Sequence, residues 1–212
     1  MECLAILIRQ YLMHQLHQVI DYHYPVQGTF HVTGGARLVG EVKVSGAKNS
    51  ALKLMTAALL AEGKSIISNV PNIADVHIME ELLTRLGCKC SYDKNTLELS
   101  IDVPSEPGHR ADYDLVRKMR ASINVLGPLL ARIKEVEVAL PGGDAIGSRG
   151  LDFHIKGLEL LGANIHLEHG YIIAKAPNGL TGAAVTLDFP SVGATENLMT
   201  AAVLANGVTT ID

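Results

Sequence analysis

Apolar residues recur at helical spacing in two early segments of the chain. They cover residues 51–62 and residues 75–86, with Val76, Met79 and Leu83 on one face of the second segment. Gly63 and Gly87 follow these segments, and glycine is the residue that most often ends a helix. The pattern therefore predicts two amphipathic helices.

Between and after these helices the pattern changes to that of strands. Residues 65–70 are rich in branched apolar side chains and are followed by Pro71, and residues 88–101 predict two strands around Lys94-Asn95. Upstream, residues 29–45 predict a hairpin around Gly34-Gly35. Helix and strand thus alternate along the first hundred residues.

The same order of elements returns later in the chain. The pentapeptide Leu-Met-Thr-Ala-Ala occupies residues 54–58 and recurs unchanged at 198–202, an offset of 144 residues. A middle copy is offset by 70 residues, so that Leu59-Leu60-Ala61 corresponds to residues 129–131. The sequence therefore predicts three copies of one structural unit.

The second copy contains a loop that the first copy lacks. Asp75 follows Pro71 by four positions, whereas Asp152 follows Pro141 by eleven. The added residues belong to the stretch 140–149, which combines three glycines with Asp144 and Arg149. Glycine-rich backbone can point several N–H groups at an anion, and a guanidinium suits phosphate. A surface turn is the alternative, but the first copy folds without these residues, which favours a functional loop.

The repeat alignment also compares the starts of the three helices. Lys48 and Asn49 in the first copy correspond to Lys118 and Met119 in the second and to Val192 and Gly193 in the third. Helix N-termini favour anions, and nearby cations strengthen such a site. If the three starts meet, one pocket contains Lys48, Arg120, Asp144, Arg149 and Ser191. For each residue alone, a solvated surface group is the alternative.

Composition narrows the classes of partner. Hydrophobic residues make up 48% of the 212 residues and aromatic residues 4%, so the predicted core is aliphatic. The formal net charge of −4 gives no reason to expect nucleic acid or an anionic membrane as a partner. An anion must therefore be bound by a local site.

Cysteine, histidine and the N-terminal pattern point to a cytoplasmic protein without a metal. Three cysteines, Cys3, Cys88 and Cys90, are an odd number and favour a reducing compartment. His14, His17 and His23 match no metal-ligand spacing. Residues 1–28 lack the basic start, continuous apolar stretch and cleavage site of a signal peptide, and no other run reaches the length of a membrane span.

Four motifs carry a resemblance to a known family. They are Ser45-Gly46-Ala47-Lys48-Asn49, Met119-Arg120-Ala121-Ser122, the stretch 140–149, and Pro190-Ser191-Val192-Gly193-Ala194-Thr195. In this order and spacing, from about Phe30 to Asp212, the chain closely resembles the UDP-N-acetylglucosamine 1-carboxyvinyltransferase family of enolpyruvyl transferases.

The resemblance implies a fold and a division of the chain. The expected fold is an α/β class, inside-out α/β barrel domain of three βαβαββ repeats, at about residues 46–101, 112–176 and 185–212, the last incomplete. Residues 1–28 are then an atypical N-terminal extension. Residues 29–45 are expected to form strands that, in the family, pair with a second domain, which we expect to be missing from this chain.

The resemblance also implies a reaction. The family transfers the enolpyruvyl group of phosphoenolpyruvate to the 3′-hydroxyl of UDP-N-acetylglucosamine and releases phosphate, without a metal or cofactor, in the first committed step of peptidoglycan synthesis. The expected partners are these two small molecules, with no nucleic acid and no membrane. Because the family site forms between two domains, we expect little turnover from this chain alone, and self-association as a way to cover its exposed face.

Roles can be carried over motif by motif. Asp144 falls at the position of the general acid, often a cysteine in the family, which implies insensitivity to the thiol-alkylating epoxide fosfomycin. Catalysis and phosphoenolpyruvate binding would also involve Lys48 and Asn49, with Arg149 holding the same substrate. The residues implied for the nucleotide sugar are Arg120, Arg149, Gly150, Leu151, Asp152, Phe153, Ser191, Val192 and Gly193. Gly150 stands where many members of the family have a proline, and Phe189 stands where some have a lysine.

Two other functions stay open at this point. The sister enzyme that uses shikimate 3-phosphate shares the fold and the chemistry, although residues 46–49 and 141–149 are not typical of it. A catalytically silent fragment that binds a nucleotide sugar, or that associates with a complementary chain, is the alternative of another class.

Overall fold

The computed structural model describes residues 31–32, 34–35, 37, 39–141 and 150–212, which belong to two units, residues 1–45 and residues 46–212. The described residues of the first unit form no strand, so the hairpin expected over 29–45 is not found there. Val32, Val39 and Val44 are 70–88% exposed. A two-stranded hairpin without a further partner is marginally stable in water, which accounts for the difference.

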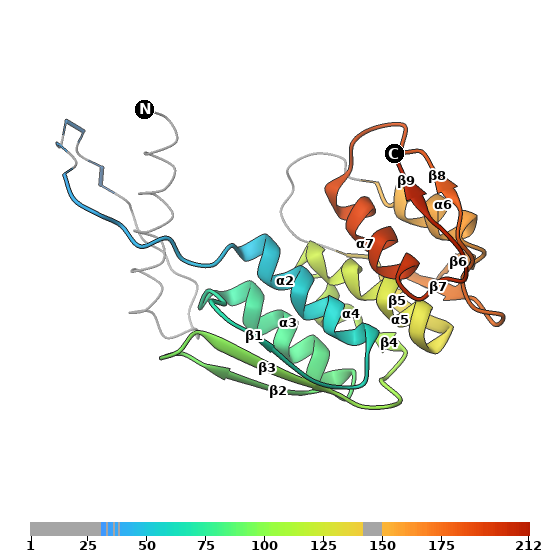
Figure 1. Ribbon diagram of the computed structural model, residues 1–212, viewed down its shortest axis with the longest axis horizontal. Coiled ribbons are helices and arrows are strands. Elements are labelled where there is room, and N and C mark those ends of the chain that lie inside the picture. Colours follow the sequence, from blue (N-terminus) through green and yellow to red (C-terminus); the bar gives the residue numbers. More distant parts are fainter. Residues whose placement is uncertain (1–30, 33, 36, 38, 142–149) are drawn as a thin grey trace. The chain divides into compact units, whose positions relative to one another are not determined.

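The second unit begins with the first repeat (Figure 1). Its elements are helix α2 (Lys48–Ala57), the 3₁₀ helix η1 (Ala58–Leu60), strand β1 (Gly63–Ile67), helix α3 (Ala74–Arg85) and strands β2 (Lys89–Asp93) and β3 (Glu98–Val103). Both β1 and β2 pair antiparallel with β3. Gly87 ends α3 with a φ of +91°, as the pattern predicted. Helix α2 starts three residues before the predicted Ala51, because Ala47 precedes it without a side-chain cap that would mark the start.

The second repeat adds one strand at its start and otherwise has the same topology as the first. It contains β4 (Arg110–Ala111), α4 (Tyr113–Val116), η2 (Arg120–Val125), α5 (Leu126–Ile133), β5 (Glu135–Ala139), α6 (Asp152–Leu160), β6 (Asn164–Glu168) and β7 (Tyr171–Lys175). Strand β7 pairs antiparallel with β5 and β6, as β3 does with β1 and β2. Strand β4 lies parallel to β5, so the helices between them form a βαβ crossover.

The third repeat starts in the same way. Strand β8 (Ala184–Val185) lies parallel to β9 (Thr210–Ile211), and helix α7 (Val192–Ala202) connects them. The crossover from β8 to β9 therefore repeats the one from β4 to β5. The expected mixed α/β fold built from recurring βαβαββ units is confirmed by this topology.

The helices that open the repeats pack against one another. Helix α7 lies beside α5, and η2, which leads into α5, packs against both α2 and α7 (Figure 1). The shared core is almost wholly aliphatic, with Leu59, Leu126 and Leu198 all fully buried. Packing therefore brings η2, at the start of the second repeat, against α2 of the first repeat and α7 of the third.

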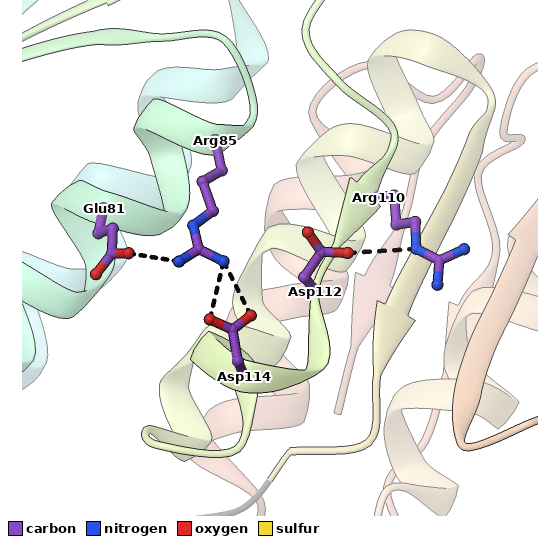
Figure 2. A network of polar contacts seen from close by, with 5 residues as sticks. All are labelled: Glu81, Arg85, Arg110, Asp112 and Asp114. Atoms are coloured by element: carbon purple, nitrogen blue, oxygen red, sulfur yellow. Dashed lines mark hydrogen bonds and ion pairs between the residues drawn. The ribbon is translucent and has the colours of Figure 1, made fainter.

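Surface charges join the first repeat to the second (Figure 2). Arg85 of α3 donates from Nη1 to both carboxylate oxygens of Asp114 in α4, each at 2.9 Å, and from Nη2 to Glu81 at 2.6 Å. Arg110 donates to Asp112 at 3.3 Å in the same region. Arg85 thus joins α3 to α4 through exposed ion pairs, which solvent screens.

Within the described residues, no helix has both the length and the apolar character needed to cross a bilayer.

Candidate nucleotide-sugar site

Leu140 and Pro141, which follow β5, and Gly150 and Leu151, which precede α6, form one wall of the candidate site. After β5 ends at Ala139, the N–H of Leu140 donates to the carbonyl of Gly170 at 2.9 Å, which fixes the exit of the strand. The chain is described again from Gly150, two residues before α6 begins. Asp144 and Arg149 lie outside the described residues, so the structure does not test the general acid or the second predicted arginine.

A cavity of about 420 Å³ opens at this wall. Arg120 enters it from the first residue of η2, and its Nη2 donates to the carbonyl of Gly150 at 3.3 Å. The lining combines one guanidinium and one carboxylate with mainly apolar side chains, an arrangement that suits a flat ring with polar substituents. The lining residues are Arg120, Leu140, Pro141, Gly150, Leu151, Asp152, Ile155 and Leu167.

The cavity brings together four of the residues named from the sequence. Arg120 lies thirty positions before Gly150, and Leu151 and Asp152 lead into α6. A Cβ on Gly150 would come within 2.4 Å of Oδ1 of Asp152, so a larger residue there would displace that carboxylate. Phe153 follows on α6 and is half-buried.

Three further predicted residues form the start of α7. Ser191 caps the helix, and its Oγ accepts the N–H of Ala194 at 3.3 Å. Val192 is 70% exposed and Gly193 is half-buried. As in any helix, the N–H groups of the first residues have no partner within α7, so they are available to an anion.

A buried polar network connects the start of α6 to the middle of α7. His154 on α6 is 4% exposed, and its Nδ1 lies 3.0 Å from Nδ2 of the fully buried Asn197 on α7. Oδ1 of Asn197 accepts the N–H of Gly127 in α5 at 2.7 Å. Burial, with a smaller contribution from Arg120, lowers the pKa of His154 to about 4, against a smaller opposing effect of Asp152. The imidazole is therefore neutral at pH 7.

Sequence reasoning missed this network, although a signal for it exists. Leu151, His154, Leu158 and Leu161 have the spacing of one helical stripe, so His154 occupies a position that should be apolar. Asn197 is likewise a polar residue among apolar ones, since it lies with Ala194 and Leu198 on the buried face of α7. A polar residue within a buried stripe requires a partner, and each is the other's.

Lys48 and Asn49 lie in the first turn of α2 and are exposed. Lys48 is ion-paired with Asp75, in the first turn of α3. The structure thus places the ammonium group at a helix N-terminus, as predicted, with a carboxylate as its partner. Neither Lys48 nor Asn49 is among the residues that line the cavity.

The described part of the chain contains no cluster of three or more His, Cys, Asp or Glu side chains suited to a metal ion.

The profile of one protein family matches most of the chain. This family is described as EPSP synthase (3-phosphoshikimate 1-carboxyvinyltransferase), and the match covers residues 32–212.

Among curated proteins, several bacterial relatives have more than half of the aligned residues in common with this chain. The UDP-N-acetylglucosamine 1-carboxyvinyltransferase of Corynebacterium jeikeium is 56% identical over 187 residues, which cover 88% of this chain and 44% of the relative. The enzyme of the same name from Mycobacterium tuberculosis is 57% identical over 182 residues, covering 86% and 43%. The chain therefore spans less than half the length of the curated relatives it matches.

Solved structures support the fold. The enolpyruvyl transferase NikO from Streptomyces tendae has a TM-score of 0.70 at 22% identity and covers 84% of this chain and 41% of its own. EPSP synthase from Acinetobacter baumannii has a TM-score of 0.63 at 20% identity, with 81% and 40% covered. The chain thus has the fold of a single domain of such proteins.

Proposed function

Because the chain belongs to the EPSP synthase family, we propose that it is the nucleotide-sugar-binding domain of a UDP-N-acetylglucosamine 1-carboxyvinyltransferase. The observation that carries this proposal is the identity of 52–57% to curated relatives of that name over 85–88% of the chain. The activity of the whole protein would be transfer of the enolpyruvyl group of phosphoenolpyruvate to the sugar 3′-hydroxyl, in peptidoglycan synthesis in the cytoplasm.

The geometry of the cavity supports a nucleotide as the ligand. Apolar walls at Leu140, Pro141 and Ile155 can cover the faces of a uracil ring, while polar groups at Gly150 and Asp152 can meet its edge. The guanidinium of Arg120 and the N–H groups at the start of α7 suit the diphosphate. In this proposal Gly150–Phe153 and Ser191–Gly193 bind UDP-N-acetylglucosamine.

The reacting centre would be served by residues of the loop and of α2. A general base would take the proton of the sugar 3′-hydroxyl, whose oxygen adds to C2 of phosphoenolpyruvate while Asp144 gives a proton to C3. Loss of phosphate and of a proton from C3 then restores the double bond. Lys48, Asn49 and Arg149 would hold the anionic substrate, for which the ammonium of Lys48 must exchange its contact with Asp75.

Shikimate 3-phosphate is the less favoured acceptor. The family description names that reaction, but the solved EPSP synthases are 20–21% identical to this chain. The relatives that act on the nucleotide sugar by name are more than twice as similar.

Two assays test the proposal. In isothermal titration, the 212-residue chain should bind UDP-N-acetylglucosamine and not shikimate 3-phosphate. For turnover, the chain is fused to the C-terminal half of the Corynebacterium jeikeium relative, and phosphate release from phosphoenolpyruvate is measured with each acceptor. Release only with the nucleotide sugar, lost in Asp144→Ala, is the expected result. A folded chain that binds only shikimate 3-phosphate would refute the proposal.

Asp144 also predicts the response to fosfomycin. Since a carboxylate is a poor nucleophile toward an epoxide compared with a thiolate, the active fusion should keep its activity after incubation with the drug. The Asp144→Cys variant is the matched control and should be inactivated with time. Inactivation of the unmodified fusion, with an adduct on the Asp144 peptide, would contradict the assignment.

A further inference from the structure

An ion pair joins the starts of two neighbouring helices. Lys48 is the first residue of α2, and Asp75 lies in the first turn of α3, which packs against α2. The ammonium of Lys48 is paired with the carboxylate of Asp75, and the two side chains are 53% and 26% exposed. Because water reaches both groups, the ammonium can leave this carboxylate for another anion without crossing a dry interior.

The backbone on either side of the pair is held in place. A Cβ on Gly46 would overlap the carbonyl oxygen of Asn69, so the chain that enters α2 packs directly on the turn before α3. The N–H of Val70 donates to the carbonyl of Leu97 at 2.8 Å, and Oη of Tyr92 donates to the carbonyl of Val70 at 2.9 Å. These contacts tie the turn to the sheet, so a change at the pair is a movement of the flexible lysine side chain.

The carboxylate of Asp75 has a second source of stabilisation. The first N–H groups of α3 have no partner within the helix, and the positive end of the helix dipole favours a negative charge in the first turn. Asp75 therefore stays stabilised when the ammonium of Lys48 moves away. The contact between the two side chains can thus be broken and formed again at small cost.

Any anion that binds Lys48 competes with Asp75. In the proposed function this anion is phosphoenolpyruvate before the reaction and phosphate after it. We propose that Asp75 is a positioning residue that takes back the ammonium of Lys48 and thereby promotes the release of phosphate after each turnover. The inference rests on the proposed function, because Lys48 is assigned there to the anionic substrate.

The competition can be measured on the chain itself with inorganic phosphate. Asp75→Asn keeps the size of the side chain and removes its charge, so the variant should bind phosphate about twofold to fivefold more tightly. The amide shifts of Lys48 and Asn49 in ¹H–¹⁵N spectra report the binding, and Lys48→Met should abolish it in both backgrounds. Equal affinities, or no binding by either protein, would overturn the proposal.

Glu81→Gln is the matched control. Glu81 lies on the same helix as Asp75 but is ion-paired with Arg85, so its substitution removes one negative charge from α3 without releasing Lys48. The affinity for phosphate should not change in this variant. If Glu81→Gln tightened phosphate binding as much as Asp75→Asn does, the effect would come from net charge alone and the proposal would be wrong.

Steady-state kinetics of the fusion enzyme described above test the role in release. Asp75→Asn should lower both the inhibition constant of phosphate and the KM for phosphoenolpyruvate by about twofold to fivefold, with the KM for UDP-N-acetylglucosamine unchanged. A damaged site would bind these ligands more weakly, so tighter binding of the two anions separates competition from a structural defect.

The kinetic results also separate this inference from the proposed function. If the fusion is active with the nucleotide sugar and its inhibition by phosphate is the same with and without Asp75→Asn, the role of Asp75 is refuted while the proposed function stands. If the folded fusion shows no turnover with the nucleotide sugar, the proposed function is refuted, and with it the role in phosphate release.

Discussion

The pentapeptide that ends α2 and begins η1 recurs in α7, and the two copies bury different faces of it. In α2, Met55 is fully buried and Leu54 is 52% exposed, whereas in α7 Leu198 is fully buried and Met199 is 54% exposed. The buried face of α7 is thus shifted by about one residue relative to that of α2, although the side chains are identical. The neighbours differ, since α2 packs against α3 and η2, while α7 packs against α5, α6 and η2.

The rotation changes the chemistry at one repeat position. Lys53 of α2 and Asn197 of α7 are 144 residues apart and therefore correspond. Lys53 is partly exposed and ion-paired with Glu196 of α7, whereas Asn197 is fully buried and bonded to His154 and Gly127. Local sequence makes both segments helical, but the contacts of each helix decide which face becomes core and which position becomes a polar contact.

Alanine substitutions within the shared pentapeptide give the largest expected effects. Met55→Ala in α2 and Leu198→Ala in α7 each remove a fully buried side chain and should lower the free energy of unfolding by about 2–5 kcal/mol. The matched controls, Leu54→Ala and Met199→Ala, should cost less than about 1 kcal/mol. Urea unfolding measures all four. If the two alanine variants within α2, or the two within α7, lost equal unfolding free energy, the two helices would not bury different faces.

Helices α2 and α7 also show which features could be predicted from the sequence and which could not. Periodicity and the repeat predicted the helices, the strands and their recurrence, because these depend on nearest neighbours along the chain. The repeat alignment also predicted one pocket for Lys48, Arg120, Ser191 and two residues that lie outside the described part of the chain; of the three described residues, only Arg120 lines the cavity. The face that α7 buries was not predictable, because it is set by α5 and α6, which lie elsewhere in the sequence.

The buried polar network was out of reach for a related reason. His154 and Asn197 are 43 residues apart, and each alone resembles an exception in an apolar stripe. Their pairing depends on the close approach of α7 to α5 and α6, where a Cβ on Gly127 would lie 2.3 Å from the carbonyl oxygen of Asn197. The glycines in these helices were visible in the sequence, but their partners were not.

Acid should destabilise the protein through His154, which is buried between α6 and α7. The pKa of His154 is about 4 in the folded chain against 6.5 in the unfolded one, so the unfolded state takes up the proton first as the pH falls. The stability is fully present above pH 6.5 and decreases toward pH 4, by about 3 kcal/mol, since each pKa unit corresponds to about 1.4 kcal/mol. Arg120 and Asp152 are the charged groups that act on the ring.

His154→Leu isolates this contribution from that of the carboxylates. Urea midpoints at several pH values between 7 and 4 should fall more steeply for the unmodified chain than for the variant. Parallel curves would show that His154 is not kept neutral by burial.

Substitutions at the corresponding positions of α2 and α7 should differ in cost. Asn197→Ala leaves the N–H of Gly127 and Nδ1 of His154 without partners and should lower the free energy of unfolding by about 2–3 kcal/mol. Lys53→Ala removes one partly exposed ion pair and should cost about 1 kcal/mol or less. Thermal and urea unfolding measure both, and similar costs would remove the distinction between the two positions.

The smallest effect is expected for the ion pair between Lys53 of α2 and Glu196 of α7. Nζ of Lys53 lies 2.5 Å from Oε1 of Glu196, and the two side chains are 27% and 23% exposed. In a double-mutant cycle of Lys53→Met and Glu196→Gln, a partly solvated pair should show a coupling of about 0.5–1 kcal/mol at low salt. The coupling should shrink in 1 M salt, where screening reaches down to about 3 Å. A coupling well above that range that persists in salt would mean that charge, and not apolar packing around η2, holds α2 against α7.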